Sequence, residues 1–159
     1  MAASPSQNLQ HATRQRWLSV LAHAKRSALE RHAALLVEYP FEWLRMPEVG
    51  LTMVRARISG HGDRFNLGEA TVTRCAVWHQ PARGAATAGV GYVLGRDPRR
   101  SEWVAQFDAL LQVPVLQAWL VHDVIEALDA GTAERHAQQW ALTASSRVRF
   151  FTMQPEAAT

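Results

Sequence analysis

The chain has 159 residues, of which 48% are hydrophobic and only 19% are charged, against roughly 25% charged in an ordinary soluble domain. This length is typical of one domain that buries a core without cross-links, which excludes a small disulfide-stapled protein and a disordered chain. The net charge of +3 is a cancellation, because residues 51–100 carry eight arginines against three acidic residues, whereas residues 101–134 carry six acidic residues and no basic one.

The compartment is predicted from cysteine use and hydropathy. Cys75 is the single cysteine, so the chain has no internal disulfide and nothing indicates an oxidising environment. No stretch approaches the ~18 apolar residues of a membrane span, and residues 1–10 lack the apolar core of a signal peptide. We therefore expect a cytoplasmic protein.

The N-terminal part is predicted to be helical after a polar leader. Residues 1–12 are expected to be flexible, because small and polar side chains bury too little surface to offset ordering. A helix is predicted from Thr13, which is a plausible N-cap, and a second from about residue 27 to 39. Residues 41–46 are interpreted as the start of a strand that Pro47 interrupts.

The middle of the chain alternates with a period of two residues, which is typical of strands. Residues 51–59 and 69–79 are predicted to form an antiparallel pair around the turn-prone residues 60–63. A third short strand is predicted at residues 89–94, after a loop rich in glycine, alanine and proline.

The last third returns to a helical period. Asp97 and Pro98 form a helix start signal, and this helix is expected to end at Pro114. A helix over residues 115–129 is expected to end at Gly131, followed by a helix from Thr132 to about residue 142 and a strand over residues 145–153. The sequence thus predicts one α+β domain over residues 13–153, with a central antiparallel sheet flanked by N-terminal and C-terminal helices, and a flexible tail over residues 154–159.

Common catalytic and metal-binding patterns do not fit this sequence. The glycines at residues 60 and 62 lack the third glycine and the helix of a dinucleotide fingerprint, and the single lysine lies outside any glycine-rich loop. His61 and His79 flank the predicted hairpin and would be the one candidate metal pair, although solvated loop histidines are the simpler interpretation. Cys75 is predicted to be buried and inert, because a reactive thiol needs an exposed electropositive setting.

Polar residues around the hairpin are the best candidates for contact with a substrate or a partner. Arginine binds phosphate or phosphonate oxygens bidentately, and threonine hydroxyls add neutral donors. Two alternatives stay open: solvation or pairing with acids of a neighbouring chain, and nucleic-acid binding, against which stand the low net charge and the lack of a recognition motif. The candidates are Arg55, Arg57, Arg64, Glu69, Thr71, Thr73, Arg74, Arg96 and Asp97.

Six tryptophans are spread over every predicted element. Trp17 and Trp103 lie on apolar stripes and are predicted to be in the core. Trp78, Trp119 and Trp140 do not lie on such stripes and are candidates for surface positions. Because aromatic residues and arginine are enriched at protein interfaces, these tryptophans and the low charged fraction suggest a partly covered surface.

Four stretches of this sequence resemble the PhnG family, the G subunit of the bacterial phosphonate carbon–phosphorus lyase system. They are TRQRWLSVLAHA at residues 13–24, GHGDRFNLGEATVTRCAV at 60–77, YVLGRD at 92–97 and SRVRFFTM at 146–153.

The resemblance implies a subunit of α-D-ribose 1-methylphosphonate 5-triphosphate synthase. In that system, subunits G, H, I and L together replace the adenine of ATP by an alkylphosphonate such as methylphosphonate and leave the triphosphate intact, and subunit J later cleaves the carbon–phosphorus bond. Subunits G, H, I and J form a core assembly, and because the chemistry is attributed to subunit I, that subunit is the expected direct partner.

The same resemblance implies that this chain binds no cofactor of its own, since Mg-ATP is a substrate of the complex. It supplies no catalytic residue to carry over, and it implies neither a membrane nor a nucleic-acid partner. A scaffold or assembly subunit without a role in the chemical step is the alternative.

Overall fold

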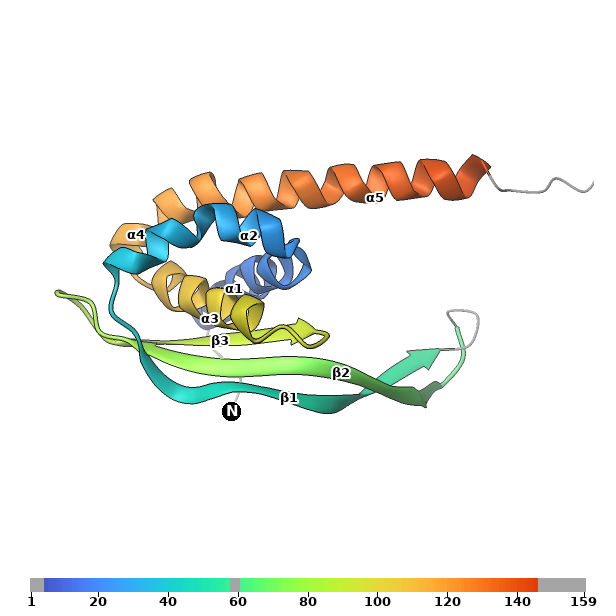
Figure 1. The fold of residues 1–159 in the computed structure, drawn as a ribbon, viewed down its shortest axis with the longest axis horizontal. Coiled ribbons are helices and arrows are strands. Elements are labelled where there is room, and N and C mark those ends of the chain that lie inside the picture. Colours follow the sequence, from blue (N-terminus) through green and yellow to red (C-terminus); the bar gives the residue numbers. More distant parts are fainter. Residues whose placement is uncertain (1–4, 58–60, 146–159) are drawn as a thin grey trace, which may run out of the picture.

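The structure, a computed structural model, describes residues 5–57 and 61–145, with side chains from residue 10 onward. Helices from both ends of the chain stack on one face of a three-stranded antiparallel sheet (Figure 1). The predicted α+β class is therefore confirmed. The predicted strand after Ser145 and the predicted C-terminal tail lie outside the described residues.

The sheet has the order β1-β2-β3, with β1 at Glu42–Arg57, β2 at Arg64–His79 and β3 at Thr87–Leu94. The predicted hairpin is confirmed, and its register pairs residues 42–57 with residues 64–78. β3 pairs only with residues 72–79 of β2. Residues 51–57 and 64–71 therefore continue past β3 as a two-stranded extension, called the hairpin arm below (Figure 1).

β1 corrects the prediction that Pro47 separates two strands. The strand runs through Pro47, with register shifts between Trp43 and Arg45 and between Arg45 and Glu48. β1 is an edge strand, where a proline removes no ladder hydrogen bond that the sheet needs. An irregular edge thus absorbs a residue that would break a central strand.

The helix α3, at Pro98–Leu111, packs closely on β3 because the strand presents glycines to it. A Cβ atom at Gly89 would lie 2.0 Å from the carbonyl oxygen of Ala105, and one at Gly91 would lie 1.9 Å from that of Ser101. Trp103 is 4% exposed, in agreement with its predicted place in the core.

The first helical segments begin earlier than predicted. α1 spans Pro5–His23, so residues 5–12 are helical where a flexible leader is expected, and Thr13 lies inside the helix. Proline suits the first turn of a helix, where its missing N–H is not needed. The predicted second helix is confirmed as α2 at Arg26–His32, followed by the 3₁₀ segment η1 at Ala33–Glu38.

The acidic part of the chain forms successive helical segments without a break between them. α4 at Pro114–Leu120 leads into the π-helical segment η3 at Val121–Glu126 and then into α5 at Ala127–Ser145. The prediction that Gly131 ends a helix is wrong, because Gly131 lies within α5. Leu128, 4% exposed in the core, holds this part of α5 against the body, which offsets the roughly 1 kcal/mol that an interior glycine costs.

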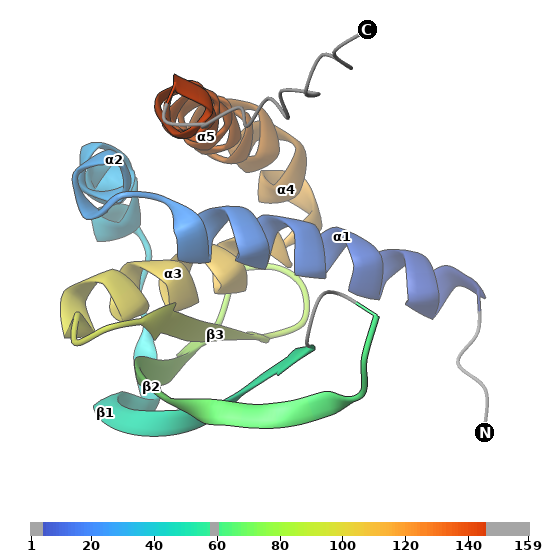
Figure 2. The ribbon, with the colours of Figure 1, turned by 90° about the vertical axis from the view of Figure 1, so that its right-hand side faces the viewer.

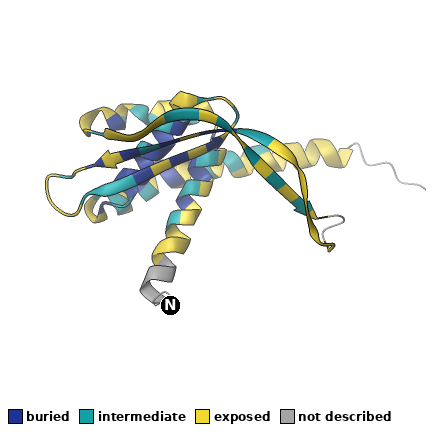
Figure 3. Cartoon of the chain, turned by 90° about the horizontal axis from the view of Figure 1, so that it is seen from below, coloured by how far each residue is buried: buried dark blue, intermediate teal, exposed yellow. Residues whose placement is uncertain are grey.

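The core lies between the sheet and the helices. α1 crosses between α3 and the C-terminal helices (Figure 2) and contributes the buried Trp17 and Leu21. Figure 3 shows the buried residues gathered where the three-stranded part of the sheet and the helices overlap, which is called the body below. The hairpin arm and the distal half of α5 are mostly exposed. Both features extend from the same side of the body (Figure 1).

Candidate functional site

Two of the predicted site residues are used by the fold to shape the turn between β3 and α3. Thr73 is fully buried, and its Oγ1 donates to the carbonyl oxygen of Gly95 at 2.7 Å and accepts from the amide of Asp97 at 3.0 Å. Gly95 has φ +92°, a conformation that favours glycine. Asp97 caps α3 by accepting from the amide of Arg100 at 3.0 Å and pairs with Arg26 at 3.4 Å. Arg96 lies exposed in this turn.

Arg74 lies on the face of the sheet that is turned away from the helices, opposite Tyr92. Its Nε donates to Oε1 of Glu48 at 2.5 Å, and Arg45 reaches the same oxygen at 3.0 Å. The hydrogen bond from Arg74, helped by the charge of Arg45, lowers the pKa of Glu48 below its usual value. Of the alternatives left open by the sequence, pairing with an acid applies to Arg74, although the acid belongs to the same chain.

The hairpin arm collects the other predicted arginines on one face. Arg57 and Arg64 lie directly opposite each other, and Arg55, two residues before Arg57, lies opposite Asn66. Residues that are paired across strands or separated by two positions along a strand share a face. All three arginines are exposed, and none of them forms an ion pair within residues 5–57 and 61–145.

Glu69 and Thr71 lie on the same arm, nearer to the body. Glu69 is opposite Met53, and Thr71 is opposite Leu51. The predicted set is therefore divided among the β3–α3 turn, the outer face of the sheet and the arm, and the structure does not gather it into one cleft.

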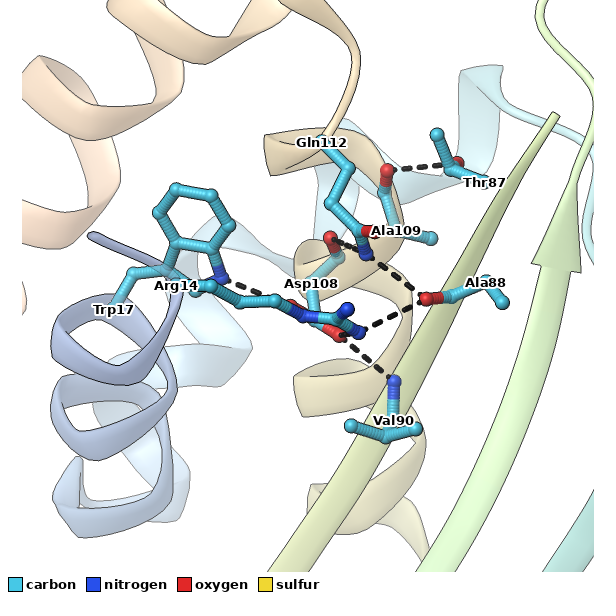
Figure 4. A network of polar contacts seen from close by, with 8 residues as sticks. All are labelled: Arg14, Trp17, Thr87, Ala88, Val90, Asp108, Ala109 and Gln112. Atoms are coloured by element: carbon cyan, nitrogen blue, oxygen red, sulfur yellow. Dashed lines mark hydrogen bonds and ion pairs between the residues drawn. The ribbon is translucent and has the colours of Figure 1, made fainter. Parts of the chain in front are cut away.

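A buried carboxylate that is not among the sequence-predicted site residues, Asp108, joins three elements (Figure 4). Its side chain is fully buried and binds Arg14 of α1 at 3.1 and 2.7 Å. Trp17 Nε1 donates to it at 2.8 Å, and the amide of Val90 in β3 donates at 2.9 Å. A buried charge needs this degree of pairing to be tolerated.

Further bonds close the network around Asp108. Nη2 of Arg14 donates to the carbonyl oxygen of Ala88 at 3.1 Å, which also accepts from the Gln112 side chain at 2.9 Å. Thr87 Oγ1 donates to the carbonyl oxygen of Ala109 at 2.9 Å. An open depression of ≈ 450 Å³ lies beside this network, and its lining includes three glutamine side chains, His11 and Arg14. The charge of Arg14, the one arginine in that lining, is neutralised by Asp108.

The one candidate metal pair does not form. His61 is at the turn end of the hairpin, whereas His79 is at the far end of β2, 16 residues long, and a strand of that length spans roughly 50 Å. His79 is buried, hydrogen-bonds the carbonyl oxygen of Pro40 at 2.9 Å and packs on Tyr39 and Phe41. Among the described residues, no group of three or more histidine, cysteine, aspartate or glutamate side chains is arranged to hold a metal ion.

Cys75 is buried, as predicted. It lies beneath α3, where Ser101 Oγ donates to its sulfur at 3.4 Å. Burial raises the pKa of the thiol, which keeps it protonated and unreactive at neutral pH.

Comparison with known proteins assigns the family. The family model described as "Phosphonate metabolism protein PhnG" matches residues 12–154. A protein of Rhizobium meliloti (strain 1021) is 42% identical over 112 residues, which cover 69% of this chain and 67% of the relative, and it is named subunit PhnG of α-D-ribose 1-methylphosphonate 5-triphosphate synthase. The chain belongs to the PhnG family.

The match to the PhnG family spans the structural features described above. Residues 12–154 include the whole arm, the β3–α3 turn and the network around Asp108. Of the four stretches that resemble the family, three contribute to these features and the fourth lies outside the described residues. Within the part of the chain that is described, no helix is long and apolar enough to cross a membrane.

Proposed function

We propose that this chain is an obligate, non-autonomous subunit of the enzyme complex that makes α-D-ribose 1-methylphosphonate 5-triphosphate in phosphonate metabolism. With subunits H, I and L it would replace the adenine of Mg-ATP by an alkylphosphonate at ribose C1, in the cytoplasm. The family match over residues 12–154 carries this proposal, supported by the printed name of the Rhizobium relative. Mg-ATP is then a substrate of the complex, and this chain needs no cofactor of its own.

An uncovered apolar face of the sheet supports a role in assembly. On the side turned away from the helices, Trp78 is 38% exposed, Val90 42%, Tyr92 48% and Leu94 64%. Val90, Tyr92 and Leu94 alternate along β3, and Trp78 of the neighbouring β2 lies opposite Ala88, two residues before Val90. Monomeric proteins rarely leave a contiguous apolar surface of this kind uncovered, so we expect a partner subunit on it.

The distal half of α5 supports the same conclusion. Every residue from His136 to Ser145 is exposed, including Trp140 at 74% and Leu142 at 71%. In proteins most of a helix's stability comes from the packing of one face, which this half of α5 lacks in the described structure. A partner that covers this half would stabilise it.

Subunit I is the proposed direct partner, with H and J in the same core assembly, and the chemical step is proposed to occur mainly on subunit I. This division fits the internal use of polar groups in the body of the chain, where Thr73 and Asp97 hold a turn and Arg74 pairs with Glu48. The body would therefore contribute an interface to a partner and no reactive polar group. A scaffold without any part in the reaction remains the second candidate for the same reason.

The test is reconstitution from purified subunits. Subunits H, I and L are mixed with ATP and methylphosphonate, with and without this chain, and adenine release is measured. We expect release only when the chain is present. Undiminished release without it contradicts an obligate role.

A further inference from the structure

The arm carries arginines at positions where their charges do not stabilise the fold. Arg57 and Arg64 are directly opposite on the two strands, and like charges in that position destabilise a strand pair. Arg55 adds a third guanidinium on the same face. The isolated arm therefore carries an electrostatic cost that an anion would remove.

The arginines of the body are used differently. Arg14, Arg26 and Arg74 each pair with a carboxylate of this chain. The arm also has carboxylates, at Asp63 in the turn and at Glu69, but neither pairs with the three arginines in the described structure. Glu69 lies opposite Met53, which is two residues and therefore roughly 7 Å along the strand from Arg55, and roughly 13 Å from Arg57.

The arm also reaches beyond the body. The last residue of β2 paired with β3 is Val72, so residues 64–71 extend past it by about 26 Å at ~3.3 Å per residue. No helix covers this extension (Figure 1). Its arginines are thus presented to whatever lies next to this subunit, and not to a cleft of this chain.

We propose that the arm inserts Arg55, Arg57 and Arg64 into the nucleotide site of a neighbouring subunit, where they bind the triphosphate of the substrate. This inference rests on the proposed function, whose substrate and product both carry a triphosphate. Guanidinium groups match phosphate oxygens bidentately, and several on one face fit a chain of phosphates better than a single small anion. Because the triphosphate does not react, the arginines position the substrate and are not catalytic.

The consequence for kinetics is specific. A contact made equally with bound substrate and transition state affects KM and leaves kcat unchanged. Replacing Arg57 and Arg64 by Gln in the reconstituted complex is expected to raise KM for ATP about tenfold or more, because hydrogen bonds to charged groups are stronger than those between neutral groups. The change in kcat is expected to stay within about twofold, and inhibition by tripolyphosphate should weaken in parallel with the rise in KM.

The matched control removes the same charge elsewhere. R31Q/R83Q changes two exposed arginines outside the arm and is expected to leave KM unchanged. R57K/R64K keeps the charge without the planar fork and should give an intermediate KM. The double glutamine variant removes a repulsion, so its thermal unfolding temperature should not fall.

Several results would overturn the inference. An unchanged KM for ATP in R57Q/R64Q would show that the arm does not contact the triphosphate. An equal rise in KM in R31Q/R83Q would show that the effect comes from the overall charge of the chain and not from the arm. Loss of co-purification would assign the arginines to an acidic protein surface, and arm-dependent DNA binding with unchanged KM would assign them to nucleic acid. Omission of the wild-type chain, run in parallel, tests the proposed function separately.

Discussion

Asp108 lies where the helical pattern calls for an apolar residue, four positions after Val104 and three before Leu111. Both of those neighbours are fully buried, and so is Asp108. An acid within an apolar stripe indicates a buried partner, and Arg14 is that partner. The sequence contained this signal, but it could not tell which of 16 arginines would meet the carboxylate.

The first prediction concerns this pair. Asp108→Asn removes the charge that neutralises Arg14 and is expected to lower the free energy of unfolding by about 3 kcal/mol, as for other buried pairs that lose one partner. Urea unfolding followed by circular dichroism measures the change. Asp129→Asn is the control, because Asp129 of α5 pairs at 3.7 Å with Arg16, which lies on α1 like Arg14 but is exposed. Exposed pairs of this kind contribute about 0–1 kcal/mol. Equal losses in both variants would contradict the role of burial.

The second prediction concerns pH. Burial raises the pKa of Cys75, so the folded state keeps the proton longer than the unfolded state does. The stability that depends on this thiol is therefore complete below the unfolded pKa of roughly 8.5 and is lost as the pH rises through the folded pKa. The free energy of unfolding of the wild type should fall above about pH 8.5 relative to Cys75→Ala. Parallel pH profiles for the two proteins would show that the thiol is not protected.

At the scale of elements, the contact between α3 and β3 depends on the absence of side chains. Gly89 and Gly91 alternate with exposed residues along β3, and α3 lies so close that a Cβ atom at either glycine would meet backbone. The turn beyond β3 is then fixed by Thr73 and the cap on α3. This close packing explains why β3 has glycine at the two positions that face α3.

The third prediction tests that contact. Gly91→Ala must push α3 away from β3 and is expected to lower the free energy of unfolding by about 1–3 kcal/mol. Gly50→Ala is the control, because Gly50 is also a strand residue and a Cβ atom there has no atom within 4 Å. Thermal unfolding of both variants gives the comparison. A loss at Gly50 as large as at Gly91 would point to strand flexibility instead of close packing.

Local sequence signals predict the positions of most elements, but they do not predict element ends that depend on tertiary contacts. The two-residue period located the β1–β2 pair, and the Asp97 cap with Pro98 located the start of α3. The sequence pattern predicts breaks at Gly131 and Pro47, but Leu128 anchors α5 in the core and β1 is an irregular edge strand. Sequence therefore locates elements through their own residues and misplaces ends that are set by a neighbour.

The candidate site shows the same limit at the scale of the whole molecule. All nine candidates lie on or near the sheet, as the hairpin prediction implied, but β3 ends at Leu94 while β1 and β2 continue. That difference in strand length separates Arg57 and Arg64 from Thr73 and Asp97. The residue pattern of one strand does not predict the residue at which the neighbouring strand ends.

The fourth prediction concerns assembly. Leu94→Asp places a charge on the uncovered sheet face and is expected to lower co-purification with the partner subunits at least about tenfold, because burying an unpaired charge at an interface is costly. Leu94 is 64% exposed, so the unfolding temperature of the isolated chain should change little. Val115→Asp, at an 85% exposed position on α4, is the control and should co-purify normally. Normal co-purification of Leu94→Asp would place the interface elsewhere.

The bond between Arg14 and Asp108 joins residues that are 94 positions apart. During synthesis, the ribosome must therefore complete about two thirds of the chain before α1 meets the carboxylate that holds it. Until then Trp17 and Leu21 have no α3 to pack against and remain exposed on the nascent chain, a condition that favours aggregation. We expect the yield of folded protein to depend on how promptly α3 follows the sheet out of the ribosome, with the N-terminal helix among the last parts to settle.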